Sequence, residues 1–388
     1  MSARTAAAFT RLEQTWRKVL SHSAVPSAFH SWEFAHEWWR HFVLGRVGGA
    51  TGQYEVVVVS TADGLPVAVL PFYVESAMGR RSLGTTLQPF GRSSSFETMT
   101  DSPVAIYRVG FEARALEAVK SYLAGQRRDW DIAAVRANPS DTSVASPSPR
   151  FAGTAPVVEV TRVCEAPLIA PLSASWAAYR ATLSKSMRDN VAYYPRKLTR
   201  ERPRWSLREV RLPAEIGAAT ATLIRLHRMR SAAATGVPHY NHIQTAGQAE
   251  FLHRWFKRAA ERNQVGIWLL EIDGQVAAAQ VFLDSPASVA IYYSGYDERY
   301  YRYSPLTIIT AEAIRAGIER GVRRLEFPPS VTAWKARWGV QECGGIAETS
   351  IYSIHPRALA RGMLRRLYFR TMPQHLDNTA SVQVYDRR

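Results

Sequence analysis

The residues best suited to chemistry in this chain surround a predicted helix start. Arg302 and Tyr303 come directly before Ser304 and Pro305, and Leu306 follows. Serine is a preferred N-cap residue, and proline fits the first position of a helix because that position needs no N–H donor. The first N–H groups of a helix have no partner inside it and carry the positive end of its dipole. This helix start, beside Arg302, is therefore a candidate anion site, and the alternative is an ordinary capped helix that binds nothing.

Two other polar groups have the residue types that bind substrates. Lys185 and Arg188 lie three positions apart in a basic run, hence on one face of a predicted helix. Aromatic residues interleave with this run, so it suits the phosphates of an acceptor or of RNA, or else it is a solvated basic face. His227 and Arg228 belong to the histidine cluster of the chain, whose spacing fits no standard zinc signature. We expect contacts to an acceptor there and no bound metal.

The charge of the chain is strongly uneven. The 388 residues carry a formal net charge of +16, and their composition is that of a folded protein long enough for two domains. Residues 1–165 hold 17 basic and 15 acidic side chains, whereas residues 166–388 hold 32 and 18, a net charge of +14. This asymmetry indicates either an anionic partner for the second half, such as a phosphorylated cofactor, a nucleotide sugar, a lipid phosphate or RNA, or a solvated basic surface.

Several classes of protein are disfavoured. The two cysteines, Cys164 and Cys343, provide neither a disulfide framework nor a thiolate metal cluster. No apolar run has the length that spans a bilayer, and the first residues lack the apolar region of a signal peptide, so we expect a cytoplasmic protein, either free or peripheral to the inner face of the membrane. There is no Walker motif, and the glycines of 45–52 have no strand leading into them, as a dinucleotide fingerprint requires.

The order of predicted elements recurs in the two halves. Each half has helices, an antiparallel hairpin around an Asp-Gly turn, further strand material, a helix and a final strand. This repetition predicts an α/β (α+β) fold of two related modules, residues 1–165 and 166–388, each a mostly antiparallel sheet flanked by helices. The predicted hairpins lie at 54–73 and 266–284, and the further strands at 130–137, 288–297 and 323–327. The predicted helices lie at 15–20, 31–42, 111–124, 175–200, 213–232, 245–262 and 304–321, and linker material lies at 138–156.

The second half resembles the GNAT acyltransferase superfamily. The segments that carry the resemblance are EIDGQVAAAQVFL, YYSGYDERYYRYSPLTIITAEAIRAGIERGVRRLEF and TAWKARWG. More closely, they are similar to the acetyltransferases named for cellulose biosynthesis (CelD/BcsL-like), which are related to the Fem-type aminoacyl transferases. FHSWEFAHEWWRHF, VAVLPFY and LQPFG in the first half look like that family's N-terminal module, so the likeness covers most of the chain and implies tandem GNAT-like modules.

The resemblance also implies a donor thioester, acetyl-CoA or a longer acyl-CoA. Its pyrophosphate is expected at the helix start, which makes the cofactor-binding residues those named first above, Arg302 to Leu306. The glycine-containing loop that is usual in GNAT enzymes is absent here and is replaced by residues 301–306.

Two carboxylates are candidates for the base that acyl transfer requires. Asp297 follows the third predicted strand and Glu326 lies on the next one, an order that places both toward a cleft. A base must take the proton of the attacking amine or hydroxyl. The alternatives are that Asp297 caps a turn and that Glu326 pairs with Arg323 or Arg324. No serine or cysteine nucleophile with an adjacent base is evident, so direct attack on the thioester is the simpler scheme.

Three more residues complete the predicted site. Lys335 occupies a lysine position of the family pattern, where a cation would stabilise oxyanion charge, or else it is an exposed helix lysine. Trp334 beside it is expected to contact substrate. Tyr293 is a further candidate donor, although a tyrosine on a strand also serves packing.

The resulting prediction is an acyl-CoA-dependent N- or O-acyltransferase. Its acceptor is expected to be a small or sugar-linked, anionic precursor of the cell envelope or of an exopolysaccharide. One alternative is a Fem-like transferase that uses aminoacyl-tRNA, which would make nucleic acid a partner. The other is a GNAT-like scaffold without catalytic activity.

Overall fold

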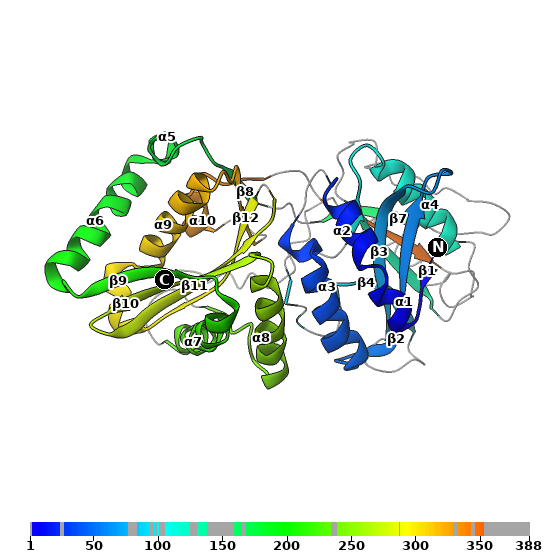
Figure 1. The fold of residues 1–388 in the computed structure, drawn as a ribbon, viewed down its shortest axis with the longest axis horizontal. Coiled ribbons are helices and arrows are strands. Elements are labelled where there is room, and N and C mark those ends of the chain that lie inside the picture. The colour runs from blue at the N-terminus through cyan, green and yellow to red at the C-terminus, as the bar shows by residue number, and fades with distance from the viewer. Residues whose placement is uncertain are drawn as a thin grey trace, which may run out of the picture.

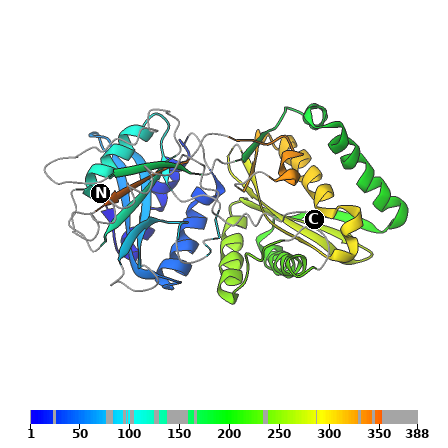
Figure 2. The ribbon, with the colours of Figure 1, turned by 180° about the vertical axis from the view of Figure 1, so that it is seen from behind.

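The structure, a computed structural model, describes residues 2–23, 27–76, 84–93, 97, 99–100, 105–124, 130–137, 159–164, 168–233, 239–286, 288–328, 332–342 and 346–352. Within these ranges the chain forms two sheets that lie side by side, each with helices on both faces (Figures 1 and 2). The predicted α/β fold of two modules is confirmed. The linker predicted at 138–156 lies outside the described residues.

The first module is built on a sheet with strand order β1-β2-β3-β4-β6-β15-β7, in which β5 also pairs with β3. One face packs under α1, α2 and α3, whereas α4 packs on the other. The strands are β1 (Ser2–Ala3), β2 (Ala50–Ser60), β3 (Pro66–Ser76), β4 (Thr85–Pro89), β5 (Ile106–Tyr107), β6 (Ile132–Ala137), β7 (Glu159–Cys164) and β15 (Ile346–Tyr352). The helices are α1 (Ala6–Thr10), α2 (Glu13–Leu20), the 3-10 turn η1 (Ala28–His30), α3 (Trp32–Trp38), the π-helical η2 (Trp39–Leu44) and α4 (Glu112–Ala124).

The second module has strand order β14-β8-β13-β12-β11-β10-β9. Helices α7 and α8 cover one face, whereas α5, α6 and α9 cover the other (Figure 1). The strands are β8 (Leu168–Pro171), β9 (Trp205–Val210), β10 (Val265–Ile272), β11 (Gln275–Asp284), β12 (Ser288–Tyr296), β13 (Arg324–Phe327) and β14 (Gln341–Glu342). The helices are α5 (Trp176–Thr182), α6 (Lys185–Glu201), α7 (Pro213–Ser231), α8 (Ala246–Ala260), the 3-10 turn η6 (Glu298–Tyr303), α9 (Pro305–Glu319) and α10 (Ala333–Ala336).

The predicted repeat is present in the topology. In the first module the hairpin β2-β3 is followed by β4, by α4 and by β6, which pairs parallel to β4. In the second, the hairpin β10-β11 is followed by β12, by α9 and by β13, which pairs parallel to β12. Asp273 and Gly274 join the second hairpin with φ of 51° and 79°, the positive angles that a tight two-residue turn requires.

Strand β15 crosses the predicted boundary between the modules. The division near residue 165 falls between β7 and β8, but residues 346–352 return to the first sheet and pair with both β6 and β7. The range 166–388 therefore contains a strand of the first module. Its pairing partners are far away in sequence, so local patterns do not reveal it.

Two predicted helices are divided in the structure. The helix expected over 175–200 breaks at Leu183, whose ψ of 154° is extended, and Ser184 then caps α6 by accepting from the Met187 amide. The helix expected over 31–42 ends as α3 at Trp38 and continues as the π-helical η2.

A single hydrophobic core joins the two modules. It is continuous from α1, α2 and α3 of the first module to α7, α8 and β12 of the second. At its centre the Phe34 ring of α3 lies 4.8 Å from the Trp255 ring of α8, and the Phe29 ring lies 5.4 Å from the ring of Tyr292 on β12. The modules therefore pack as parts of one core and not as two bodies on a linker.

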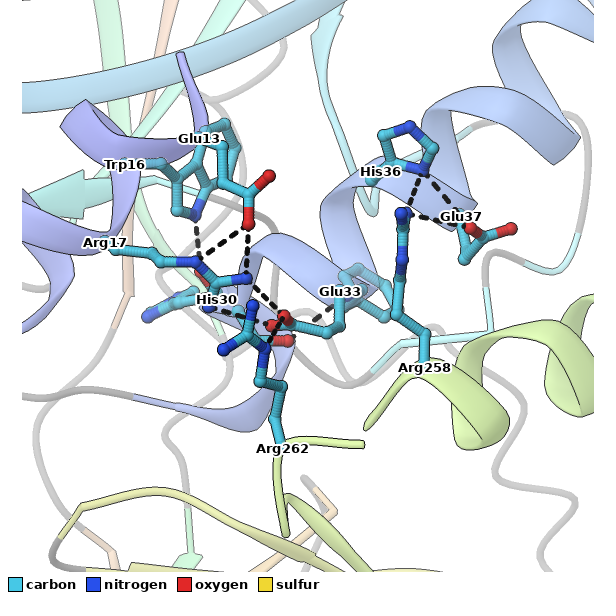
Figure 3. Close-up of polar contacts among 11 residues, drawn as sticks. Glu13, Trp16, Arg17, His30, Glu33, His36, Glu37, Arg258 and Arg262 are labelled. Atoms are coloured by element: carbon cyan, nitrogen blue, oxygen red, sulfur yellow. Dashed lines mark hydrogen bonds and ion pairs between the residues drawn. The ribbon is translucent and has the colours of Figure 1, made fainter. Parts of the chain in front are cut away.

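Ion pairs border this shared core (Figure 3). Glu33 of α3, which is 1% exposed, accepts from Arg17 of α2 and lies 3.8 Å from Arg262, just beyond α8. Arg258 of α8 contacts His36 and Glu37 of α3, the latter at 3.1 Å. The paired charges fix α3 against α8 in both position and rotation.

Candidate functional site

The second sheet opens between two parallel strands. β12 and β13 pair only from Ser288 to Ala290 and from Arg324 to Glu326, although β12 continues to Tyr296. Beyond Ala290, no described strand pairs with that edge of β12. In α/β sheets ligands bind outside the carboxyl ends of parallel strands, where neighbouring strands separate. The opening is therefore the first candidate for a substrate site.

A β-bulge lies on β12 directly after the strands separate. Ile291 pairs with Phe282 and Ser294 pairs with Gln280, so Tyr292 and Tyr293 together face one residue of β11. A bulge breaks the alternation of side chains along a strand. Both tyrosines consequently contact the core shared by the modules, with ring centroids 4.0 Å apart.

The start of α9 lies after the carboxyl end of β12. Ser304 is the N-cap residue and Pro305 the first helical residue, as the sequence predicts. The side chain of Ser304 makes no hydrogen bond to a helix amide, and its Oγ contacts the Thr307 hydroxyl at 2.9 Å. Ser304 has a φ of 47°, a left-handed conformation that glycine commonly supplies. The chain therefore makes a tight turn into α9 without the glycines of the usual loop.

The residues before α9 are held by α6. Arg302 contacts Glu201 at 3.1 Å and donates to the Tyr303 hydroxyl at 2.6 Å, while Lys197 lies 5.8 Å from the centre of the Tyr303 ring. Tyr303 is buried, Arg302 is exposed and Leu306 is partly buried. Two cations thus lie beside the start of α9, where a bound anion would meet them.

The equivalent helix start in the first module differs in charge. The first turn of α4 contains the acidic residue Glu112, whereas the first turn of α9 contains none. A carboxylate in the first turn already interacts with the positive end of the helix dipole and repels a second anion. This contrast favours α9 over α4 as a site for phosphates.

Glu326 faces the interface side of the second sheet. It lies opposite Ala290 of β12, whose side chain belongs to the shared core, while its neighbours Leu325 and Phe327 belong to the core around α9. Its Oε1 atom is buried and has no hydrogen-bond partner among the described residues. Burial raises the pKa of its carboxyl group, as desolvation disfavours the charged form. A carboxylate with a raised pKa is a stronger base than an exposed one.

Asp297 has a structural role at the turn after β12. Its carboxylate accepts from the Arg299 backbone N–H at 3.0 Å and from the Arg299 guanidinium at 2.6 Å. These bonds from Arg299 lower the pKa of Asp297. The alternative that Asp297 caps the turn is what the geometry supports, and we do not carry it forward as the base.

Lys335 is buried and not an exposed helix lysine. Its Nζ donates to the Pro328 carbonyl at 2.7 Å, just beyond the carboxyl end of β13. The ring of Trp334 beside it packs on Phe327 at 5.8 Å. Both residues therefore connect α10 to the end of the strand that carries Glu326.

Lys185 and Arg188 make local contacts. Lys185 is highly exposed and pairs with Asp189 at 2.9 Å, whereas Arg188 donates to the carbonyls of Ala181 and Leu183 at the end of α5. These contacts are those of an exposed basic helix surface, and a role in substrate binding stays a prediction.

Tyr293 lies in the histidine cluster. His227, in the last turns of α7, donates from Nδ1 to the Ser294 carbonyl at 3.0 Å and accepts at Nε2 from the backbone N–H of His242 at 3.3 Å. The Tyr293 ring lies 5.3 Å from the His227 ring and 5.9 Å from that of His242. Burial lowers the pKa of His227 to about 4, which keeps its ring neutral. His227 therefore connects α7 with β12 and with the segment that follows α7.

The neighbouring Arg228 fixes the same segment by donating from Nε to the Ile243 carbonyl at 3.1 Å. No group of His, Cys, Asp and Glu in the described part of the chain has the arrangement of a metal site.

The first module contributes residues to this cluster that sequence analysis missed. Glu97 lies 3.7 Å from His242, the Met99 carbonyl accepts from the Tyr292 hydroxyl, and the Met99 sulfur lies 3.5 Å from the Tyr293 hydroxyl. Only the three-dimensional contact between modules identifies these residues, since nothing in their local sequence marks them.

The comparisons with known proteins agree with this geometry. Residues 185–336 match the family described as acetyltransferase (GNAT) domain. Among solved structures, FemX is 8% identical with a TM-score of 0.58, over 93% of this chain and 100% of that one. A conserved protein of unknown function from Bacteroides thetaiotaomicron is 8% identical with a TM-score of 0.54, over 91% and 100%. At such identities the likenesses show the fold alone. Among curated proteins, none matches this chain.

The second module is thus a GNAT-fold acetyltransferase domain, and the protein is an acyltransferase. The alternative of a scaffold without catalytic activity is therefore not carried forward. Among the described helices, none combines the length and apolar character needed to cross a bilayer.

Proposed function

We propose that the protein transfers an acyl group from acetyl-CoA or a longer acyl-CoA to an amino or hydroxyl group of an acceptor. The observation that carries this proposal is the opening between β12 and β13, with the start of α9 at the carboxyl end of β12. Phosphates bind well at such a helix start because free N–H groups and the helix dipole both favour negative charge. The donor pyrophosphate would lie there, beside Arg302, with the thioester extending into the opening.

Glu326 is the base in this proposal. It takes the proton of the acceptor amine or hydroxyl while that group attacks the thioester carbon. The new C–N or C–O bond forms, the C–S bond breaks, and coenzyme A leaves as its thiol after gaining a proton. The position of Glu326 on β13, next to the opening, and the raised pKa of its carboxyl group support this role.

Lys335 is proposed to stabilise the oxyanion that develops on the thioester carbonyl. A cation held in a buried position acts more strongly there than one in water. Its burial and its fixed contact with Pro328, at the end of β13, support this assignment.

The acceptor class follows from charge and from resemblance. The net charge of +14 on residues 166–388 favours an anionic acceptor. The similarity to cellulose-biosynthesis-type acetyltransferases suggests a sugar-linked precursor of the cell envelope or of an exopolysaccharide.

Aminoacyl-tRNA as donor is the second candidate. It is favoured by the similarity of the whole chain to the fold of FemX, taken with the resemblance to Fem-type transferases and the basic second half. Phosphates of RNA would then bind the basic surface that includes Lys185 and Arg188, and binding would weaken steeply as salt rises.

Donor competition separates the two candidates. The purified protein is incubated with amino and hydroxyl acceptors and with acetyl-CoA, longer acyl-CoAs or aminoacyl-tRNA, and the acylated product is detected by mass spectrometry together with free thiol. Product and thiol formed in equal amounts from an acyl-CoA support the first proposal. Product formed only from aminoacyl-tRNA would overturn it in favour of the second.

A further inference from the structure

Arg230 carries a charge that has no carboxylate partner among the described residues. It lies in the last turn of α7, donates from Nη1 to the Ser294 hydroxyl at 3.0 Å, and stacks 5.3 Å from the centre of the Tyr296 ring. Its Nε atom is buried and makes no hydrogen bond within the described structure. Placing a charged group away from water is costly unless an opposite charge compensates it.

Another partly buried arginine shows the usual solution. Arg211 pairs with Glu209 at 2.6 Å and with Asp284 at 2.5 Å. Two carboxylates thus compensate Arg211, whereas Arg230 has the Ser294 hydroxyl, the Tyr296 side chain and the negative end of the α7 dipole, but no carboxylate among the described residues. This difference between the two arginines indicates that a ligand supplies the counter-charge of Arg230.

The charges beside Arg230 do not exclude an anionic ligand. His227 and His239 lie next to each other, with Nδ1 of the first 3.4 Å from Nε2 of the second. Desolvation and the nearby Arg230 lower the pKa of His239 to about 2, so this ring is neutral. His242 lies on the outer side, with its side chain 38% exposed and Glu97 3.7 Å away. Glu97 therefore lies against His242, and none of the ion pairs among the described residues involves Arg230.

The position of Arg230 relates it to the proposed reaction. Its partner Ser294 lies directly after the two tyrosines of the bulge, on the part of β12 that no longer pairs with β13. Arg230 extends from α7 to the Ser294 hydroxyl and to the Tyr296 ring, which belongs to the core around α9, so a ligand on Arg230 would border the opening at this edge of β12.

We propose that Arg230 binds an anionic group of the acceptor, a carboxylate or a phosphate, at the interface between the modules. This inference rests on the proposed acyl transfer, because it assigns the site to the acceptor. Arginine suits this role because its planar guanidinium binds either anion through two parallel hydrogen bonds. The acceptor class is therefore an amine or alcohol that also carries a carboxylate or a phosphate.

The test measures anion binding directly, without any donor. Calorimetric titrations with inorganic phosphate and with glutarate are made at constant ionic strength, with chloride as the reference anion. They use the Ser304→Asp protein, in which a new carboxylate repels anions from the start of α9. Arg230→Gln is added to this background, and Arg225→Gln, an exposed position on the same helix, is the matched control.

We expect Arg230→Gln to weaken binding of the preferred anion about tenfold or more, and Arg225→Gln to change it less than about twofold. Preference for glutarate would identify a carboxylate acceptor, and preference for phosphate a phosphorylated one. Equal affinity in the Arg230→Gln protein, or no anion binding above the chloride reference, would overturn the inference.

Arg230→Lys covers the case in which the glutamine variant does not fold. Its ammonium group keeps the charge but lacks the planar fork, so glutarate affinity should fall about fivefold, and an unchanged affinity would refute the role of the guanidinium. Acetyl-CoA binding is measured separately in the protein with native Ser304. Its absence would count against the proposed acyl-CoA donor, whereas a failure of anion binding counts only against Arg230.

Discussion

The hydroxyl group of Tyr292, on the bulge of β12, donates a hydrogen bond of 2.5 Å to the backbone carbonyl of Met99 in the first module. Both residues are buried. The strand that borders the candidate site is thereby bonded to the other module at the point where it leaves β13. The two modules are thus in contact beside the candidate site as well as through one core.

Removing this bond should lower the stability of the whole chain. Tyr292→Phe leaves the buried Met99 carbonyl without this donor, so we expect the free energy of unfolding to fall by about 1–3 kcal/mol. Urea denaturation followed by fluorescence should still show one transition, because one core spans both modules. Tyr193→Phe, at an exposed position of α6, is the control and should change stability by less than about 0.5 kcal/mol. A first module that unfolds separately in the wild-type protein would contradict the shared core.

The ion pairs beside the shared core offer a matched comparison. Glu13 and Glu33 both accept hydrogen bonds from Arg17 (Figure 3), but Glu33 is buried whereas the side chain of Glu13 is 38% exposed. Glu33→Gln leaves Arg17 and Arg262 without a buried counter-charge, so we expect a loss of about 3 kcal/mol in the free energy of unfolding. Glu13→Gln should cost less than about 1 kcal/mol. Similar losses for the two variants would show that burial of the pair is unimportant.

Glu326→Gln should remove catalysis and leave donor binding intact. Loss of a general base lowers kcat by about 10²–10⁴-fold, while acetyl-CoA affinity stays within about twofold. Glu319→Gln, near the exposed end of α9, controls for loss of charge in the same module. In the wild-type enzyme, kcat should rise with pH as Glu326 loses its proton, at a pH above the ordinary glutamate value of 4.5. Full activity in the Glu326→Gln enzyme would exclude Glu326 as the base.

The carboxyl group of Glu326 should also make the free energy of unfolding depend on pH in a defined direction. Because the folded-state pKa of Glu326 is raised, its protonated form is favoured in the fold, and this advantage is lost as the pH rises through that pKa. Glu326→Gln should therefore stabilise the protein at neutral pH, with the difference disappearing below about pH 4.5. The free energies of unfolding of the wild type and of Glu326→Gln, compared between about pH 4 and pH 8, test this direction.

Asp297 should behave as a structural residue. Its pKa is lowered by Arg299, so its ion pair stabilises the fold at neutral pH and is lost as the pH falls below the ordinary value of 3.8. Arg299 is largely exposed, so Asp297→Asn should cost only about 0.5–1 kcal/mol and change kcat less than about tenfold. A fall in kcat as large as that of Glu326→Gln would instead make Asp297 the base.

Local patterns in the sequence were sufficient to predict the repeated unit. The Asp-Gly turn at 273–274 and the Ser-Pro helix start at 304–305 each depend on a few adjacent residues, and the structure confirms both. Other features depend on distant partners. Strand β15 pairs with β6 and β7, which lie more than 180 residues away in sequence, so no local pattern reveals it.

The site itself was predictable only in part. Glu326 could be assigned to a strand after α9, but its buried Oε1 is a property of packing. The same is true of Arg230, whose type and position on a helix are ordinary and whose lack of a carboxylate partner among the described residues is visible only in three dimensions. Met99 and Glu97 could not be connected with His242 or Tyr292, because they belong to the other module.

The most direct test of the account is a calorimetric titration of acetyl-CoA into three proteins: wild type, Ser304→Asp and Ser304→Asn. Both variants tolerate the positive φ of this position, and both are good N-cap residues, so the helix should stay folded. They differ in one charge. We predict that Ser304→Asn binds within about threefold of wild type and that Ser304→Asp binds at least about tenfold more weakly, because its carboxylate repels the pyrophosphate. Equal affinities in all three proteins would contradict the proposed position of the donor at the start of α9.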